Sequence, residues 1–330
     1  MFDECIIRGE RFSPARFCAP LAGYSHSAFR RLVAELGGCG ALWTEMLAAR
    51  QIINENFEKS PWLKRRSVEG CVFYQLMINA GDPFEKILNR MGENGIRAID
   101  LNLACNAPHI RANASGSALF EQPTAMEQAV RTIRSYWPGI LTAKIRLGSH
   151  RTGWQARFIE RIRILEDAGV DALILHTRFF EDRFRRTAHH QYFAWAKEQT
   201  RLPMIANGDI EGPAHAKQLE SELHSASGIM IGRMAVVRPW IFRGWNAPLN
   251  PDYAGIWNKM YDYIMEDFDP ATALRRIQMF SKYFGANFAF GHQFNCMLGR
   301  AKNTVEILQF AMEFFSKSQA LISRPVVAGL

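Results

Sequence analysis

The chain has 330 residues, with 40 Lys and Arg against 32 Asp and Glu, so its formal net charge is +8. A content of 48% hydrophobic and 22% charged residues excludes a disordered or collagen-like chain. A chain of this length can bury one large core, alone or with a smaller appended domain. The positive balance permits an anionic partner such as nucleic acid but does not require one.

The N-terminal and cysteine patterns are typical of a soluble protein in a reducing compartment. The N-terminus, MFDECIIRGERF, carries charges where a signal peptide would be apolar, and no segment approaches the ~20 apolar residues of a membrane span. The six cysteines form no Cys-x-x-Cys pair and no zinc-binding spacing. We therefore expect a cytoplasmic protein with no metal site and no membrane contact.

Eight short apolar runs, separated by amphipathic stretches, extend to residue 232. The runs are residues 17–21, 41–46, 72–77, 98–103, 141–146, 172–177, 203–207 and 228–232. The amphipathic stretches predict helices at 27–36, 83–94, 124–137, 154–168, 192–199 and 212–223. Apolar strands alternating with helices indicate a parallel sheet covered on both faces, and eight such units favour an α/β fold of the (β/α)8 TIM barrel type. The polar segment 51–66 is interpreted as a surface excursion rather than a barrel helix.

The pattern changes after residue 240. Residues 246–251 (NAPLNP) resemble a linker, and the helical periodicity that follows covers 253–268, 270–284 and 288–317 without strand signals. We therefore expect a catalytic barrel over residues 1–245 and a smaller C-terminal helical domain over residues 250–330.

In a barrel of this type the working side chains lie where the strands end, because the loops there form the mouth. Reading those ends in chain order gives Pro20, Ala22, Gly23, Thr44, Glu45, Gln75, Asn102, Cys105, Lys144, Arg146, His176, Arg178, Asn207, Gly208, Asp209, Gly232 and Arg233. The last two loops favour a phosphorylated cofactor, because glycine N–H groups can approach an anion closely. The chain has neither a GxGxxG motif after a strand nor a P-loop, so those two nucleotide sites are not supported.

Each of these residues also has an ordinary structural interpretation. Asn207 to Asp209 could form a simple turn, Lys144 could be a solvated strand end, and Cys105 could be a small buried apolar side chain. The convergence of Gln, Asn, Cys, Lys and His from four consecutive strands favours one functional site.

Nine motifs in order carry a family resemblance between residues 19 and 242. They are APLAG (19–23), TEM (44–46), QL (75–76), DLN (100–102) with Cys105, GSAL (116–119), KIRLG (144–148), HTR (176–178), ANGDI (206–210) and MIGR (230–233). With these motifs the chain resembles the dihydrouridine synthase family, flavin enzymes that reduce uridine in transfer RNA.

The resemblance implies a role for each matched position. Cys105 would protonate C5 of the uracil after hydride from reduced FMN reaches C6, and Asn102 and Arg178 would bind the substrate. The residues implied to hold FMN are Pro20, Ala22, Gln75, Lys144, His176, Asn207, Gly208, Asp209, Gly232 and Arg233. NADPH or NADH would reduce the flavin, and the helical domain would help a monomeric enzyme hold tRNA.

Two departures from the family pattern leave the substrate open. Ala104-Cys105-Asn106 stands where the family usually has Gly-Cys-Pro, and the segment 180–190 is rich in Arg and His, including Arg183, Arg185 and Arg186, which could contact phosphates. Ribosomal RNA is therefore an alternative substrate. A small-molecule pyrimidine or flavin oxidoreductase and an inactive RNA-binding relative are further alternatives. The basic balance and helical tail argue against the first, and the intact Cys105 argues against the second.

Overall fold

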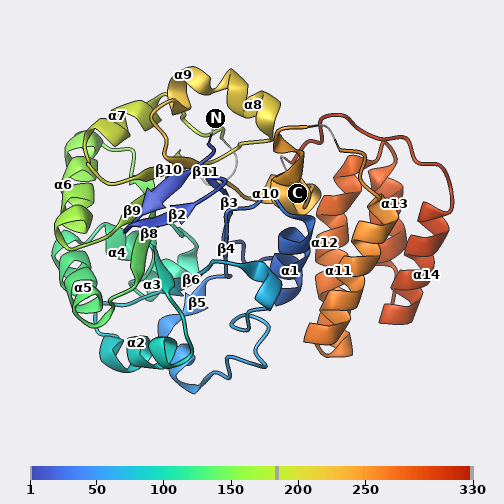
Figure 1. The fold of residues 1–330 in the computed structure, drawn as a ribbon, viewed down its shortest axis with the longest axis horizontal. Coiled ribbons are helices and arrows are strands. Elements are labelled where there is room, and N and C mark those ends of the chain that lie inside the picture. The colour runs from blue at the N-terminus through green and yellow to red at the C-terminus, as the bar shows by residue number, and fades with distance from the viewer. Residues whose placement is uncertain (1, 183–185, 248, 328–330) are drawn as a thin grey trace.

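Eight parallel strands close into a barrel in the computed structural model, which describes residues 2–182, 186–247 and 249–327 (Figure 1). The strands are β3 (Arg16–Cys18), β4 (Ala41–Trp43), β6 (Val72–Met77), β7 (Ala98–Asn102), β8 (Ile140–Gly148), β9 (Ala172–Phe179), β10 (Met204–Asn207) and β11 (Gly228–Ile231). The pairing of β3 with β11 and of β4 with β6 closes the ring. Every residue of these strands is buried, which is why each reads as a continuous apolar run. The predicted barrel is confirmed.

The barrel helices form where amphipathic stretches connect the strands. They are α1 (Ser27–Leu36), α2 (Phe84–Glu93), α5 (Pro123–Tyr136), α6 (Trp154–Asp167), α7 (Tyr192–Glu198), α8 (Pro213–Gln218), α9 (Glu220–Leu223) and α10 (Arg233–Val237). The helix expected over 212–223 is divided into α8 and α9 at Leu219. Segment 51–66 holds no α-helix, as expected; the short 3-10 helices η1 (Ala49–Asn54) and η2 (Ser67–Glu69) lie at its ends, and β5 (Leu47–Ala48) precedes it.

A hairpin at the N-terminus covers the barrel floor, and the sequence analysis did not identify it. Strand β1 (Cys5–Ile7) pairs antiparallel with β2 (Glu10–Phe12) through Arg8 and Gly9, both with positive φ. Two residues with positive φ are what a two-residue hairpin turn needs. The ring of Phe12 lies 5.7 Å from that of Phe73, close to the start of β6.

Four helices follow the barrel and lie side by side along one flank of it (Figure 1). They are α11 (Tyr253–Asp267), α12 (Pro270–Phe284), α13 (Gly291–Gly299) and α14 (Thr304–Phe315). The single helix expected over 288–317 is divided, because Asn303 caps α14 by accepting a hydrogen bond from the Glu306 N–H. Residues 316–327 are not helical and return to the barrel. The boundary between two domains at residues 245–250 stays a prediction.

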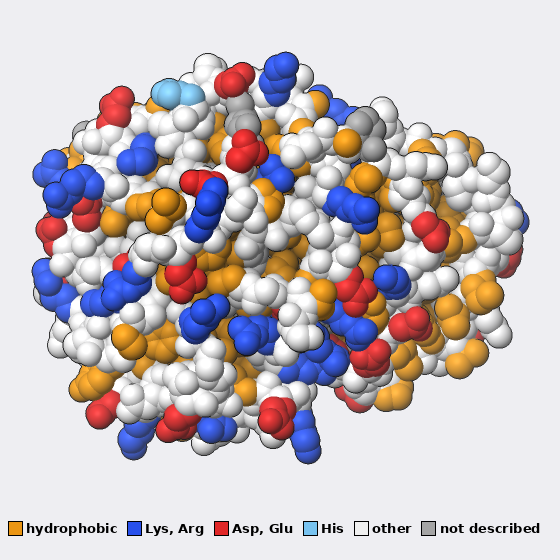
Figure 2. Space-filling view, viewed as in Figure 1, with side chains coloured by type: hydrophobic (Ala, Val, Ile, Leu, Met, Phe, Trp, Pro, Cys, Tyr) orange, Lys and Arg blue, Asp and Glu red, His pale blue; other side chains and the backbone are white. Residues whose placement is uncertain are grey.

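Ion pairs join the C-terminal helices to the barrel. The Arg31 guanidinium lies 2.8 Å from the Glu266 carboxylate, and that of Arg66 lies 2.9 Å from Asp267, which Lys64 also contacts. Figure 2 shows basic and acidic side chains gathered where the barrel meets these helices. The basic run at 64–66 therefore serves partly to hold α11.

One buried ion pair fixes the excursion between β5 and β6. Both Arg30 and Glu69 have fully buried side chains, with 2.7 Å between Nε and the carboxylate. The other Arg30 nitrogens donate to the carbonyls of Ser25 and Lys64. Because a buried charge is costly without its partner, this contact holds α1 and the excursion in one arrangement.

We predict that Glu69→Gln lowers the free energy of unfolding by about 3 to 5 kcal/mol, because the variant leaves Arg30 charged and buried without its anionic partner. Urea unfolding followed by circular dichroism measures the change. The matched control is Glu313→Gln, which removes an exposed i,i+4 contact with Lys317 and should cost less than about 1 kcal/mol. Equal losses for the two variants would contradict a structural role for the buried pair.

Candidate active site

The carboxyl ends of the barrel strands surround a cavity of about 610 Å³. This is an ordinary volume for a small-molecule or cofactor site. Most of the residues at the predicted strand ends line it, namely Pro20, Ala22, Gln75, Asn102, Cys105, Lys144, Arg146, His176, Arg178, Asn207, Gly208, Asp209, Gly232 and Arg233. Gly23, Thr44 and Glu45 are not among the lining residues. These lining residues therefore surround one cavity, and their roles stay predictions.

A chain of hydrogen bonds crosses the cavity floor and ends at the cysteine. The Asp100 carboxylate accepts from the Thr142 hydroxyl (2.7 Å) and from the Gln75 amide (2.6 Å). The Gln75 carbonyl in turn accepts from the Asn102 side-chain amide at 2.9 Å. The Asn102 side-chain oxygen accepts from the backbone N–H of Cys105 at 2.9 Å. Asn102 therefore orients the start of the cysteine loop, whatever else it contacts.

Burial gives the floor of the cavity unusual acid–base properties. It raises the pKa of Asp100 to about 6, against the opposing hydrogen bonds from Gln75 and Thr142. Burial, aided by the nearby Arg146 charge, lowers the pKa of Lys144 to about 8. Lys144 is therefore the cavity cation whose charge changes within reach of ordinary buffers.

His176 and Arg178, both on β9, meet in the cavity wall. The Arg178 guanidinium lies 2.7 Å from Nε2 of His176. Because arginine carries only donors, Nε2 must accept, which places the imidazole proton on Nδ1. Burial is the main reason that the pKa of His176 lies well below its usual value, and the charge of Lys144 lowers it further. The ring is therefore neutral at neutral pH.

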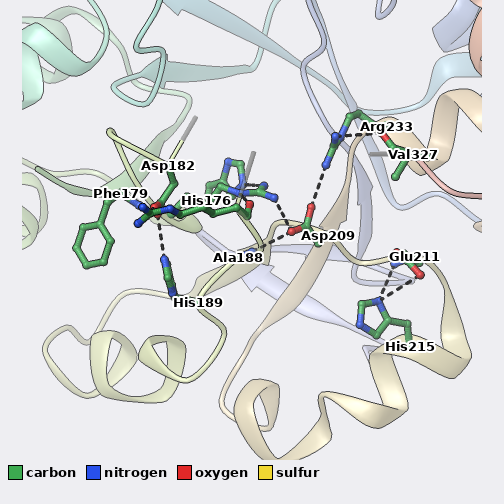
Figure 3. Close-up of polar contacts among 12 residues, drawn as sticks. His176, Phe179, Asp182, Ala188, His189, Asp209, Glu211, His215, Arg233 and Val327 are labelled. Carbon is green, nitrogen blue, oxygen red and sulfur yellow. Dashed lines mark hydrogen bonds and ion pairs between the residues drawn. The ribbon is translucent and has the colours of Figure 1, made fainter. Parts of the chain in front are cut away.

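Asp209 joins two arginines, Arg178 and Arg233; its contact with Arg233 is seen in Figure 3. Its carboxylate contacts the guanidinium of Arg178 at 2.5 Å and that of Arg233 at 2.9 Å, and it accepts from the Ala188 N–H at 2.9 Å. Although burial opposes the effect, Arg178 holds the pKa of Asp209 below its ordinary value. Arg178, expected to bind substrate, therefore also belongs to this arginine network.

Gly208 is required by the crowding beside His176. Its φ of +120° is unfavourable for other residues, and a Cβ atom there would lie 2.8 Å from the His176 ring. Because Gly208 has no side chain, its backbone atoms form this part of the cavity wall.

No metal centre or membrane-spanning helix is found in residues 2–182, 186–247 and 249–327. No group of three or more His, Cys, Asp and Glu side chains there could hold a metal ion. None of the helices in these ranges combines the length and apolar character needed to cross a bilayer.

Comparison with known proteins assigns the family. A family model described as dihydrouridine synthase (Dus) matches residues 17–319. The chain belongs to the dihydrouridine synthase family. Membership makes it a flavin-dependent oxidoreductase that acts on CH–CH bonds.

Two similar curated proteins are both named tRNA-dihydrouridine synthase B. The tRNA-dihydrouridine synthase B of Vibrio parahaemolyticus is 33% identical over 232 residues, which cover 68% of this chain and 69% of that protein. The tRNA-dihydrouridine synthase B of Escherichia coli K12 is 32% identical over 230 residues, with the same coverage of 68% and 69%.

Solved structures share the fold at low identity. An old yellow enzyme homologue from Zymomonas mobilis has a TM-score of 0.54 at 13% identity, covering 79% of this chain and 98% of that chain. The old yellow enzyme from Trypanosoma cruzi has a TM-score of 0.54 at 9% identity, covering 76% and 93%. At these identities the likeness concerns the fold alone.

Several cavity residues of this family member escaped the sequence analysis. Asp100 lies below the cavity rather than in its wall, and Glu211 and Val327 reach the wall from outside the strands. Arg146, selected with Lys144 at the same strand end, lies on β8 and also lines the cavity. Of the arginines expected to contact phosphates, Arg183 and Arg185 lie outside the described residues.

Asn106, which departs from the usual family motif, ties the cysteine loop to its surroundings. Its amide donates to the Phe180 carbonyl at 2.9 Å, beyond the end of β9. Its side-chain oxygen accepts from the Ser117 hydroxyl at 2.9 Å and from Arg111 at 3.1 Å. These contacts join the loop to the short helices α3 (Pro108–Ala112) and α4 (Ser117–Phe120). Side-chain hydrogen bonds here replace the backbone restriction of a proline.

We predict that Asn106→Ala loosens the cysteine loop, because three hydrogen bonds are lost together. The Cys105 thiol should react with iodoacetamide about tenfold faster, measured peptide by peptide with mass spectrometry, and the amides of residues 104–116 should exchange faster. Asn113→Ala is the matched control, because Asn113 lies in the same loop and is exposed. Equal labelling of both variants and the native chain would refute the role of Asn106.

Proposed function

We propose that the chain catalyses the FMN-dependent reduction of uridine to 5,6-dihydrouridine in tRNA, with NADPH as the reductant of the flavin. The main support for this proposal is that the two sides of the cavity differ in chemical character. Cys105 follows β7, whereas Gly232 and Arg233 follow β11, four strands away in a closed ring of eight. A proton donor and a phosphate-type cradle therefore lie at opposite sides of one positively charged cavity.

The lining residues fit a flavin mononucleotide. Gly208 leaves backbone exposed where a Cβ would collide with His176, and Arg233 adds a guanidinium nearby. Lys144 and Arg146 supply positive charge along the wall, which suits an electron-rich ring edge. Apolar side chains including Leu21 and Met230 complete the wall. Gln75 and Asn207 offer amide groups, although each already makes a hydrogen bond.

The chain's own groups suit the proton transfer. Bound FMN would supply the hydride that adds to C6 of the uracil. Negative charge then builds on the base, and a donor at C5 must deliver a proton. We assign this donation to the Cys105 thiol, whose loop is held by Asn102 and Asn106. His176 is neutral and carries its proton on Nδ1, so the cationic charge on this part of the wall comes from Lys144, Arg146 and Arg178.

Transfer RNA is the substrate we propose, since the similar curated proteins are named tRNA-dihydrouridine synthase B. A formal net charge of +8 is compatible with a polyanion. The target base must leave its stack to reach Cys105, and folded RNA offers splayed loop nucleotides at low cost. Ribosomal RNA and free uridine are the alternatives that an assay has to separate.

We predict that the purified protein with FMN and NADPH converts unmodified tRNA, and that Cys105→Ala forms at least about 100-fold less product while still binding FMN. Nucleoside mass spectrometry of the digested RNA measures dihydrouridine, and flavin fluorescence measures binding. Cys296→Ala is the control, because Cys296 is exposed on α13 outside the cavity. Full activity of Cys105→Ala would remove this thiol from the mechanism. Product only on ribosomal RNA, or only on free uridine, would overturn the tRNA assignment.

We also predict that FMN affinity decreases as pH rises through about 8. The lowered pKa of Lys144 means that its charge is complete below that value and is lost above it. Binding of an anionic group favours the charged form, so affinity is constant below about pH 8 and weakens by up to about tenfold per pH unit above it. The phosphate, with a second pKa of about 6, keeps its charge throughout.

Fluorescence titrations from about pH 7 to about pH 9.5 test this, with Lys144→Met as the comparison. The variant should bind FMN more weakly at neutral pH and show no decrease in this range. Burial lowers the pKa of Arg146 to about 10, so Arg146 keeps its charge in this pH range. Its titration should affect FMN affinity only above about pH 10. The same pH dependence in Lys144→Met would show that another group is responsible.

A further inference from the structure

Residues 316–327, which follow the last helix, run back to the barrel mouth. We call residues 320–327 the C-terminal strap. The Arg238 guanidinium, which follows α10, donates to the carbonyls of Ile322 at 2.7 Å and Ser323 at 3.1 Å. The Ile322 N–H donates to the Asn287 carbonyl at 2.8 Å. These backbone contacts fix where the strap leaves the helices and approaches the barrel.

The distal half of the strap reaches the cavity itself (Figure 3). The Arg324 guanidinium lies 2.8 Å from the carboxylate of Glu211, a cavity-lining residue that follows β10. Three residues later, the Val327 carbonyl accepts from the Arg233 guanidinium at 3.3 Å, while the other end of that guanidinium contacts Asp209. Val327 is itself part of the cavity lining.

The strap presents alternating faces, as an extended segment does. Pro325 and Val327 are buried, whereas Val326 between them is 72% exposed. Only 8% of Val327 is exposed, so it closes the cavity wall rather than resting on the surface. Proline at 325 restricts the backbone and thereby reduces the conformations that the strap loses on docking.

We propose that the C-terminal strap is a cofactor-binding element that covers the phosphate end of the flavin, with Val327 as its inward contact. The inference rests on the proposed FMN site. It adds to the cofactor site a wall residue that does not follow a barrel strand, because Val327 lies more than ninety residues after Arg233 in the sequence. Two contacts to Arg233, from Asp209 and from the strap carbonyl, orient the guanidinium beside Gly208 and Gly232.

A charge placed at Val327 tests this position directly. Val327→Asp should weaken FMN binding about tenfold, because the new carboxylate would face a phosphate of charge about −2 across a partly buried cavity. Riboflavin, which has the same ring but no phosphate, should be affected much less. Val326→Asp is the matched control, since it places the same charge one residue away on the exposed face.

Val327→Lys supplies the opposite sign and separates electrostatics from misfolding. Its long stem can follow the cavity wall, and its ammonium should preserve or tighten FMN binding relative to riboflavin. Dissociation constants come from flavin fluorescence titrations, and circular dichroism verifies the fold of each variant. A damaged fold would weaken both flavins and could not give opposite effects for the two charges.

The outcomes distinguish the strap from the proposed function. Native protein that binds neither flavin would overturn the FMN site and the strap with it. The strap alone would be overturned if the native protein binds FMN but the Val327 and Val326 variants have the same affinities as the native protein for FMN and for riboflavin. Equal weakening of FMN and riboflavin by Val327→Asp would also overturn it, because the strap would then not adjoin the phosphate.

Discussion

Concentrated positive charge in the barrel mouth is the constraint on which the site depends. Closing the ring places Lys144 and Arg146 on β8 beside His176 and Arg178 on β9, all buried. Burial and mutual repulsion both disfavour the charged forms, which is why the pKa values of Lys144 and His176 are lowered. An anionic ligand would relieve both effects at once, so the cavity is electrostatically prepared for one.

Two carboxylates keep this cluster stable, and they do so differently. Asp209 lies in the cavity wall and contacts Arg178 and Arg233 directly, so it spaces two guanidinium groups that would otherwise repel. Asp100 lies beneath the wall and acts on Lys144 without a direct hydrogen bond, while it holds Gln75. The same carboxylate thus supports both the charge balance and the hydrogen-bond chain that orients the cysteine loop.

The strands and the strand-end residues could be predicted because each depends on local sequence. A buried parallel strand is a continuous apolar run, and the residues at its carboxyl end face the mouth, as Asn102 at the end of β7 does. Contacts between distant segments could not be predicted. Nothing near Val327 marks it as a cavity residue, and nothing near Lys64 indicates that Asp267 will pair with it. The division between α13 and α14 was missed although Asn303 and Glu306 carry a capping pattern, because apolar periodicity continues across it.

The opposite character of the two cavity ends constrains how a substrate can approach. Cys105 and its loop follow β7, and the C-terminal strap covers the end beside β10 and β11. In the reaction we propose, hydride and proton add to adjacent carbons of one ring, so the base would lie between the flavin ring and the thiol. If the strap covers the phosphate end, as we propose, a nucleotide attached to a large RNA would enter from the side of the cysteine loop. Asn106 ties that loop to β9, and residues 106–109 form this side of the lining, so the loop in which the chain departs from its family is also the one that the incoming RNA must pass.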